Sequence, residues 1–274
     1  MSSAGAPSTG SPSDGPSMPS PPPDGDRNRG AGLIWMQTIL TAIATALVLA
    51  RLYVRSTIVR KLGLDDLFIV FGLLLSIVTL ALDGVQVHYG LGRHQYYLMF
   101  SPELMEDLVL AIKYGYIVQM ILILSTMFTR ISICFFLLKI FGSRKVWKYG
   151  LYAIMAFAVS TNIASAVTVP VQCKPVEKLW NQQLPGTCWS VNAQLAVGDF
   201  QGAVAVFCDW ILALLPIAFL WDIQMKLRIK ISICALMGLG VFTGVCALIR
   251  TLCFKSFNPS DVSWNLIPQI IWSV

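Results

Sequence analysis

Six long apolar blocks follow one another along this chain. They occupy about residues 33–53, 66–88, 113–141, 149–170, 199–221 and 231–254. Each is longer than the roughly 20 residues of helix that cross a bilayer, and none shows the ten or so alternating residues of a spanning strand. Helices satisfy their own backbone hydrogen bonds in lipid, so the blocks predict transmembrane helices. The composition agrees, because charged residues make up only 12% of the chain, about half the fraction typical of soluble domains.

The two ends of the sequence depart from this pattern. Ser, Pro and Gly dominate the first 30 residues, and such a composition buries too little apolar surface to offset the loss of chain entropy. We therefore expect residues 1–32 to form a disordered tail, without the apolar run of a signal peptide, and residues 33–274 to form one transmembrane domain. A seventh apolar block, 264–274, is too short to span. The expected fold class is an all-α membrane protein, a seven-transmembrane-helix bundle with the seventh helix truncated.

The distribution of basic residues predicts the orientation. Lys and Arg concentrate in the short loops around 51–61, 139–148 and 226–230, which follow the first, third and fifth blocks. Basic loops stay on the cytoplasmic side, so we expect an extracellular N-terminus and a multi-pass protein of the plasma membrane. The net charge of +6 would suggest nucleic acid in a soluble protein. Here the charge lies between apolar blocks and no nucleic-acid motif accompanies it, so the lipid bilayer is the expected partner and nucleic acid is not.

Two opposite charges stand deep inside apolar blocks. Arg130 lies twelve residues before Gly142, and Asp209 lies thirteen residues before Asp222, which places both about 18–20 Å from the cytoplasmic ends of their helices. A lone charge at that depth is costly and faces the bundle interior, so we expect an intramembrane ion pair. Two other interpretations remain open, namely a ligand-contacting or switching role, and an offset that leaves the two residues unpaired.

A second acidic feature stands at the start of the second block. The stretch GLDD (63–66) places Asp65 and Asp66 where a helix begins. A carboxylate there can accept hydrogen bonds from free N–H groups and meets the positive end of the helix dipole. We interpret both residues as a helix cap.

The outer loops carry two more candidates. Cys173 and Cys188 share the loop VQCKPVEKLWNQQLPGTC (171–188), which faces an oxidising compartment, so a disulfide is expected; two free thiols are the alternative. The other five cysteines lie in apolar blocks without a CxxC pattern, so no zinc site is predicted.

His88 and His94 flank the stretch YGLGR after the second block, with Asp83 nearby. These three are candidate outer-loop ligand contacts. Two histidines and a carboxylate could also hold a metal or sense extracellular pH, whereas a flexible glycine-rich loop with aromatic interface anchors is the simpler interpretation. We predict no metal here.

Several segments together resemble the fungal rhodopsin-domain family, the Pth-type, GPCR-like integral membrane proteins of filamentous fungi. The resemblance covers about residue 33 to the end, and its specificity comes from the order and spacing of its motifs. The resembling segments are RLYVRSTIVRKLGLDDLFIV (51–70), YGLGRH (89–94), TRISICFFLLKIFG (129–142), VQCKPVEKLW (171–180) with GTC (186–188), DWILALLPIAFLWDIQMKLRIKISI (209–233) and DVSWNLIPQIIWSV (261–274).

The resemblance implies a seven-helix bundle with an outside N-terminus. Some members of that family have been proposed as receptors for surface or host cues. A retinal Schiff base needs a lysine deep in the bundle, but Lys113 and Lys255 fall near outer membrane borders, so no cofactor is expected. A G protein is a candidate partner by resemblance alone, because the chain reads LLKIFGSRK (137–145) where an acidic-Arg-aromatic triplet would stand.

These observations favour a receptor-like or orphan membrane protein that senses an extracellular small molecule or surface cue. The alternative is a small transporter or channel that uses Arg130 and Asp209 in its pathway. We expect no enzyme, because the sequence shows no Ser-His-Asp order, no nucleophile elbow and no carboxylate pair of the glycosidase type.

Overall fold

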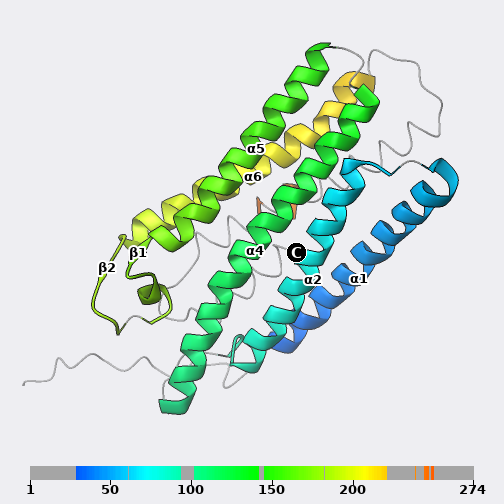
Figure 1. Cartoon of the computed structure of the whole chain (residues 1–274). Helices are drawn as coiled ribbons and strands as arrows, with labels where there is room; N and C mark the ends of the chain where they lie inside the picture. Colours follow the sequence, from blue (N-terminus) through cyan, green and yellow to red (C-terminus); the bar gives the residue numbers. More distant parts are fainter. Residues whose placement is uncertain are drawn as a thin grey trace, which may run out of the picture.

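The computed structural model describes residues 29–60, 62–93, 102–141, 145–181 and 183–220, together with 238, 244–246 and 248–249. The described chain is almost entirely helical (Figure 1). Its elements are α1 (Gly30–Val54), the π-helical turn η1 (Arg55–Val59), α2 (Leu64–His88), α4 (Pro102–Phe141), α5 (Lys145–Val171), β1 (Cys173–Lys174), the 3-10 turn η2 (Val176–Leu179), β2 (Thr187–Cys188) and α6 (Val191–Leu220).

Five helices are long and apolar enough to cross a membrane, by length and composition. They correspond to the first five predicted blocks. The sixth and seventh predicted helices, 231–254 and 264–274, lie outside the described residues apart from the few named above, and so does most of the predicted tail, 1–32. The all-helical membrane architecture is therefore shown for the described helices, and the seven-helix count stays a prediction.

All five helices begin before the residue that the apolar pattern indicates, and two of them, α4 and α6, begin eight or more residues earlier. We expected α4 from residue 113, but it starts at Pro102, which suits a first helical turn because proline lacks the N–H that would be unsatisfied there. Similarly, α6 begins at Val191 rather than 199, and Ser190 Oγ accepts a hydrogen bond from the Ala193 N–H at 3.4 Å. Hydropathy detects only the part of a helix that lies in hydrocarbon, so it misses these polar first turns.

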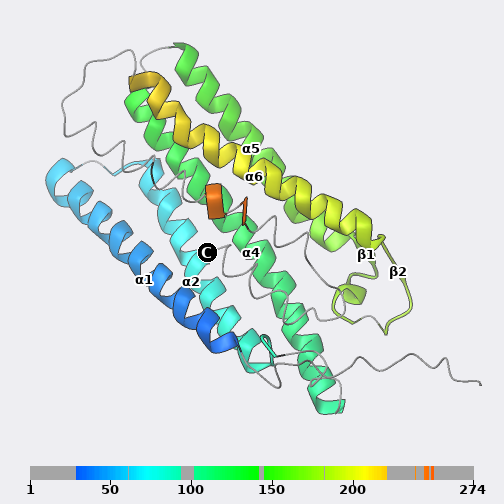
Figure 2. The ribbon, with the colours of Figure 1, turned by 180° about the vertical axis from the view of Figure 1, so that it is seen from behind.

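Helix α4 is the central element of the bundle. It packs against α2 on one side and against α5 and α6 on the other, while α1 packs on α2. Figure 1 shows α1, α2 and α4 side by side, and the view from behind in Figure 2 shows α6 running along α4 and α5.

Small residues allow α2 and α4 to approach closely. Ser125 Oγ donates a hydrogen bond to the Gly72 carbonyl at 2.9 Å, and a Cβ added at Gly72 would lie 2.8 Å from Thr129 Oγ1. Small residues at such positions are typical of helix contacts in membranes, where van der Waals packing replaces the hydrophobic effect. The rings of Phe68 and Phe135 stack beside this contact, with centroids 5.6 Å apart.

On the other side of α4, apolar side chains join it to α5 and α6. The buried cluster consists of Cys134 and Leu137 from α4, Leu151 from α5 and Leu212 from α6. The opposite faces of the helices expose large apolar side chains, which lipid would cover; examples are Trp35, Leu47, Phe200 and Phe207.

Candidate functional site

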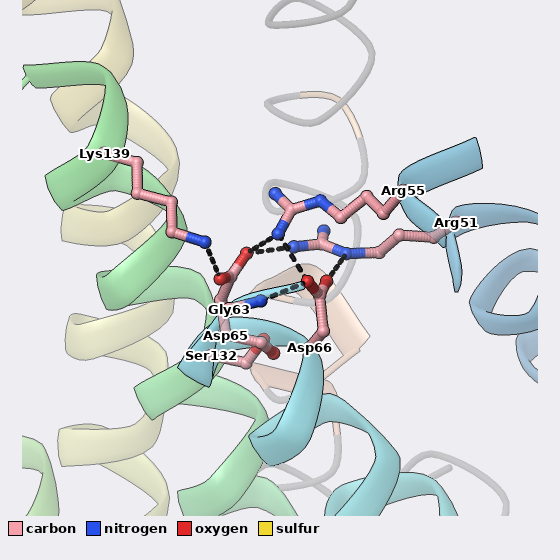
Figure 3. A network of polar contacts seen from close by, with 7 residues as sticks. All are labelled: Arg51, Arg55, Gly63, Asp65, Asp66, Ser132 and Lys139. Carbon is pink, nitrogen blue, oxygen red and sulfur yellow. Dashed lines mark hydrogen bonds and ion pairs between the residues drawn. The ribbon is translucent and has the colours of Figure 1, made fainter. Parts of the chain in front are cut away.

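A network of five charged side chains joins α1, α2 and α4 at one end of the bundle (Figure 3). We call it the inner network, and it consists of Arg51, Arg55, Asp65, Asp66 and Lys139. Both carboxylates are buried, Asp65 completely, whereas the three cations keep part of their surface exposed. Buried carboxylates of this kind require paired charges and hydrogen bonds to offset their lost hydration.

The two aspartates share the same cations. Arg51 reaches Asp65 Oδ2 with Nη2 at 2.8 Å and Asp66 Oδ1 with Nε at 3.1 Å. Arg55 Nη1 lies 2.5 Å from Asp65 Oδ2 and 2.7 Å from Asp66 Oδ2. Lys139 of α4 pairs with Asp65 Oδ1. Because each carboxylate bridges at least two cations, the network links the consecutive helices α1 and α2 to α4, through a Lys139–Asp65 contact between residues 74 apart.

Neutral groups complete the network. Ser132 Oγ donates to the Asp65 carbonyl at 2.6 Å, and the Gly63 N–H donates to Asp66 Oδ2 at 3.0 Å. The Arg51 guanidinium lies over the Phe136 ring, 5.0 Å from its centroid, in the arrangement of a cation–π contact.

The helix-cap interpretation therefore describes only Asp66, whose carboxylate accepts the Gly63 N–H. Asp65 also lies in the first turn of α2, and its carboxylate oxygens contact Arg51, Arg55 and Lys139, which the helix-cap interpretation did not include. The positions of these three cations in the sequence indicate the orientation of the chain but not their pairing with Asp65. The spacing of the two arginines could have predicted the pairing. They are four residues apart and thus on one helix face, and a tight turn and two aspartates follow them.

A second charge pair lies in the interior of the bundle. Arg130 of α4 donates from Nε to Asp209 Oδ1 at 3.0 Å and from Nη2 to Oδ2 at 3.2 Å. The side chains are 12% and 20% exposed. Arg130 lies eleven residues before the end of α4 at Phe141, about 16 Å along the helix. The structure thus brings together the two residues that depth along their helices had matched, and the geometry is the bidentate one in which guanidinium and carboxylate bind most strongly.

The three expected outer-loop contacts do not form one site. Asp83 lies inside α2, fully buried, and not in the outer loop. Its carboxylate accepts hydrogen bonds from Gln37 Nε2 at 2.6 Å and Gln86 Nε2 at 3.0 Å. His88 ends α2 and packs edge-on against Tyr89, and His94 lies outside the described residues. The helix rotation that turns Asp83 inward toward α1 separates it from the surface.

Asp83 and Asp65 lie on one seam between α1 and α2. Gln37 contacts Asp83, and Arg55 contacts Asp65. The second pair is 18 residues further along α1 and 18 residues earlier along α2, which is five helical turns and about 27 Å. Both contacts therefore lie on the same helix faces, one at each end of the membrane-spanning length.

The loop between α5 and α6 carries the disulfide that the sequence predicts, between Cys173 and Cys188. The two cysteines face each other in the antiparallel pair β1–β2. Lys113 of α4 lies over the Trp180 ring of this loop, 5.7 Å from its centroid. The loop is therefore attached to the end of the bundle opposite the inner network.

The chemistry that these residues offer is electrostatic. Within the described ranges, no group of three or more His, Cys, Asp and Glu side chains is placed to hold a metal ion. What the geometry shows are ion pairs and buried hydrogen bonds between helices, which are strong in a medium of low dielectric.

Comparison with known proteins gives related membrane proteins. "Fugralins biosynthesis cluster protein 2" of Gibberella zeae is 26% identical over 133 residues, 48% of this chain and 32% of that protein. A "SAT4 family membrane protein" of Emericella nidulans is 26% identical over 145 residues, 52% of this chain and 37% of that protein. The aligned part thus spans about a third of the length of these relatives. No solved structure matches the chain.

A family model covers most of the transmembrane domain. The model described as "Fungal rhodopsin domain" matches residues 50–274. This range includes the whole inner network, the Arg130–Asp209 pair and the disulfide loop. Together with the spanning helices, this match shows that the chain is a membrane protein and a member of the fungal rhodopsin domain family.

Proposed function

We propose that this protein is a non-enzymatic, receptor-like protein in which α6 shifts relative to α4 when a small apolar or amphipathic molecule binds in the outer half of the bundle. The observation that carries the proposal is the difference between the contacts that α4 makes with α1 and α2 and those that it makes with α6, which we call the α4–α6 joint. Helices α1, α2 and α4 are held by the inner network and by the close Gly72 contact. Helix α6 is joined to α4 through the Arg130–Asp209 ion pair and apolar side chains.

An ion pair inside the membrane suits a two-state joint. Separating Arg130 from Asp209 without replacement partners would cost several kcal/mol, so the paired arrangement is the resting state. A bound molecule or a small rotation of α6 that offers other polar partners would favour a second arrangement. Packed helices change between discrete arrangements rather than deforming continuously, and a ligand shifts them by its difference in affinity for the two.

The proposal includes an extracellular N-terminus and a plasma-membrane location. The disulfide loop and the start of α1 belong to the same side of the bundle by the alternation of the helices, and disulfides persist in oxidising compartments. The inner network lies at the opposite end, where basic residues are expected to face the cytoplasm. An impermeant thiol reagent applied to intact cells tests this with single cysteines at two exposed positions, Gln183 and Lys148. Gln183→Cys should react and Lys148→Cys should not; the reverse pattern would contradict the orientation.

A cytoplasmic partner would read the shift of α6. The exposed residues Lys145 and Lys148 at the start of α5 border the proposed cytoplasmic face. A G protein is the partner class that the family resemblance suggests, and lipid surrounds the apolar faces.

Two native cysteines allow the shift to be measured. Cys208 precedes Asp209, and Cys134 lies one turn after Arg130; both are buried. We would replace Cys234, Cys246 and Cys253 and follow the labelling of the remaining two thiols by a membrane-permeant maleimide. Decanoate and decanol serve as amphipathic probes, and radiolabelled decanoate uptake into proteoliposomes is measured in parallel.

A receptor-like joint predicts a saturable rise in labelling with a probe and no protein-dependent uptake. Asp209→Asn should raise the basal labelling, whereas the control Phe200→Leu on the exposed face of α6 should leave it unchanged. Protein-dependent uptake of decanoate would favour the transporter alternative. Labelling that ignores both the probes and Asp209→Asn would contradict a movable α6.

A further inference from the structure

A buried polar cluster lies in the outer half of the seam between α1 and α2. It contains Gln37 and Thr41 from α1 and Thr79, Asp83 and Gln86 from α2, all of them buried. Asp83 is five residues from the end of α2 at His88, about 7.5 Å along the helix. The cluster is therefore inside the helix pair but close to one membrane surface.

The partners of Asp83 leave its charge without compensation. Its two carboxylate oxygens accept hydrogen bonds from the amide groups of Gln37 and Gln86, which are neutral. In the part of the chain that the structure describes, no Lys, Arg or His forms an ion pair with it. The three aspartates of the inner network and the α4–α6 joint all have cationic partners, so Asp83 differs from each of them. A buried carboxylate without a counter-charge is costly in a membrane.

Two more oxygens in the cluster have no hydrogen bond. Gln37 Oε1 and Thr41 Oγ1 are buried and have no hydrogen-bond partner among the described residues. The neighbouring hydroxyls of α1 behave otherwise, because Thr38 and Thr45 each donate to a carbonyl one turn earlier, at 2.7 Å. Buried polar atoms without a partner are rare and call for an occupant or a specific role.

The helix register places these residues on one seam, within one helical turn of one another. Gln37 lies opposite Asp83, so Thr41, four residues later on α1, lies opposite Thr79, four residues earlier on α2. Residues four apart share a helix face. Helix α4 packs against the cluster at Gly115, where an added Cβ would lie 3.3 Å from Gln86 Oε1.

We propose that this cluster binds a monovalent cation, Na⁺, between Asp83, Gln37 and Thr41. The ligands would be carboxylate, amide and hydroxyl oxygens, which hard cations prefer. One carboxylate balances one positive charge, whereas a divalent cation would leave a net charge buried in the bundle. The short distance to the outer end of α2 lets the ion enter from the adjoining solution. The site stands independently of the signalling role proposed above.

The test is the thermal stability of the purified full-length chain in detergent. Tm is measured while choline chloride is replaced by NaCl at constant ionic strength and pH, with KCl and CaCl₂ series alongside. A site that binds the native state raises Tm in proportion to the logarithm of cation concentration above its Kd. We expect a rise of several degrees with Na⁺ that starts near the Kd and continues with the logarithm of concentration, and that Asp83→Asn abolishes.

Two variants separate the site from general folding effects. Thr41→Val removes an unused oxygen and should weaken the apparent Na⁺ affinity about tenfold, the equivalent of one lost ligand contact of 1.4 kcal/mol. Thr38→Val, whose hydroxyl bonds its own helix, should leave the affinity unchanged. If Asp83→Asn fails to fold, the wild-type titration and the two threonine variants still show whether Na⁺ binds at this cluster.

Three outcomes would overturn the proposal. One is a wild-type Tm that is the same in Na⁺ and choline, since Asp83 would then be accommodated as a neutral carboxyl. Another is stabilisation by Ca²⁺ and not by Na⁺, which would contradict the charge argument. The third is a Na⁺ response that both Asp83→Asn and Thr41→Val retain.

Discussion

Replacing Asp65 by Asn tests the inner network most sharply. The substitution keeps the shape of the side chain and removes one negative charge from the centre of a network with three cations. Asp65 is fully buried and contacts Arg51, Arg55 and Lys139. The asparagine amide cannot accept from all three, so two guanidinium groups and an ammonium group are left with Asp66 as the remaining carboxylate.

The size of the effect follows from these contacts. Removing one partner of a buried ion pair costs about 3–5 kcal/mol because it leaves the other charge uncompensated. The Lys139 side chain is 48% exposed, so its contact adds little, as exposed pairs contribute about 0–1 kcal/mol. The two arginines, 27% and 16% exposed, account for most of the loss. We therefore expect Asp65→Asn to lower the free energy of unfolding by about 3–5 kcal/mol.

Equilibrium unfolding in mixed detergent and SDS micelles measures this change. Arg60→Gln is the matched control, because Arg60 is exposed in the turn after η1, and it should alter stability by less than about 0.5 kcal/mol. Combining Asp65→Asn with Arg55→Gln removes both partners of one ion pair. The loss in unfolding free energy of the double variant should therefore be about 1–3 kcal/mol smaller than the sum of the two single losses. Additive losses, or an Asp65→Asn protein as stable as the Arg60→Gln control, would refute the network as the joint of these helices.

Two other predictions concern packing and the outer loop. Gly72→Ala should destabilise the α2–α4 contact by about 1–3 kcal/mol through overpacking, since its Cβ would lie 2.8 Å from Thr129 Oγ1. Gly84→Ala on the same helix should instead stabilise by up to about 1 kcal/mol, since nothing lies within 4 Å of its Cβ; equal effects in SDS unfolding would rule out the close approach. Cys173→Ser should lower the free energy of unfolding by about 3 kcal/mol, the value for a closed loop of about 15 residues, and should speed proteolysis between residues 174 and 187. The control Cys134→Ala should leave the proteolysis of that loop unchanged. A loop that is equally resistant in the Cys173→Ser variant would show that the disulfide does not constrain it.

The apolar blocks were sufficient to predict the five described membrane-spanning helices, because hydrocarbon selects long apolar segments whatever their tertiary packing. They could not place the starts of α4 and α6, whose polar first turns extend beyond the apolar part. The proximity of Arg130 and Asp209 could be derived from depth alone, since two isolated opposite charges at one depth have few other partners.

The inner network and the Asp83 cluster were not predictable in the same way. Several cations and carboxylates share the ends of α1 and α2, so depth does not decide which of them pair. The pairing depends on the rotation of each helix about its axis, which places Arg51 and Arg55 over Asp65 and Asp66 and turns Asp83 toward Gln37. Knowledge of either contact would have been enough to predict the other, because Asp83 and Asp65 are five helical turns apart along the α1–α2 seam.

Arg130 and Asp209 lie inside membrane-spanning helices and turn away from lipid toward each other. Exchanging the two charges shows whether this pairing is what allows them there, with the yield of monodisperse protein from membranes as the measurement. Arg130→Asp and Asp209→Arg should each reduce the yield strongly, because each leaves two like charges in the bundle, and the double variant should restore most of it. A double variant that is as poorly recovered as the single variants would show that the two charges do not depend on each other.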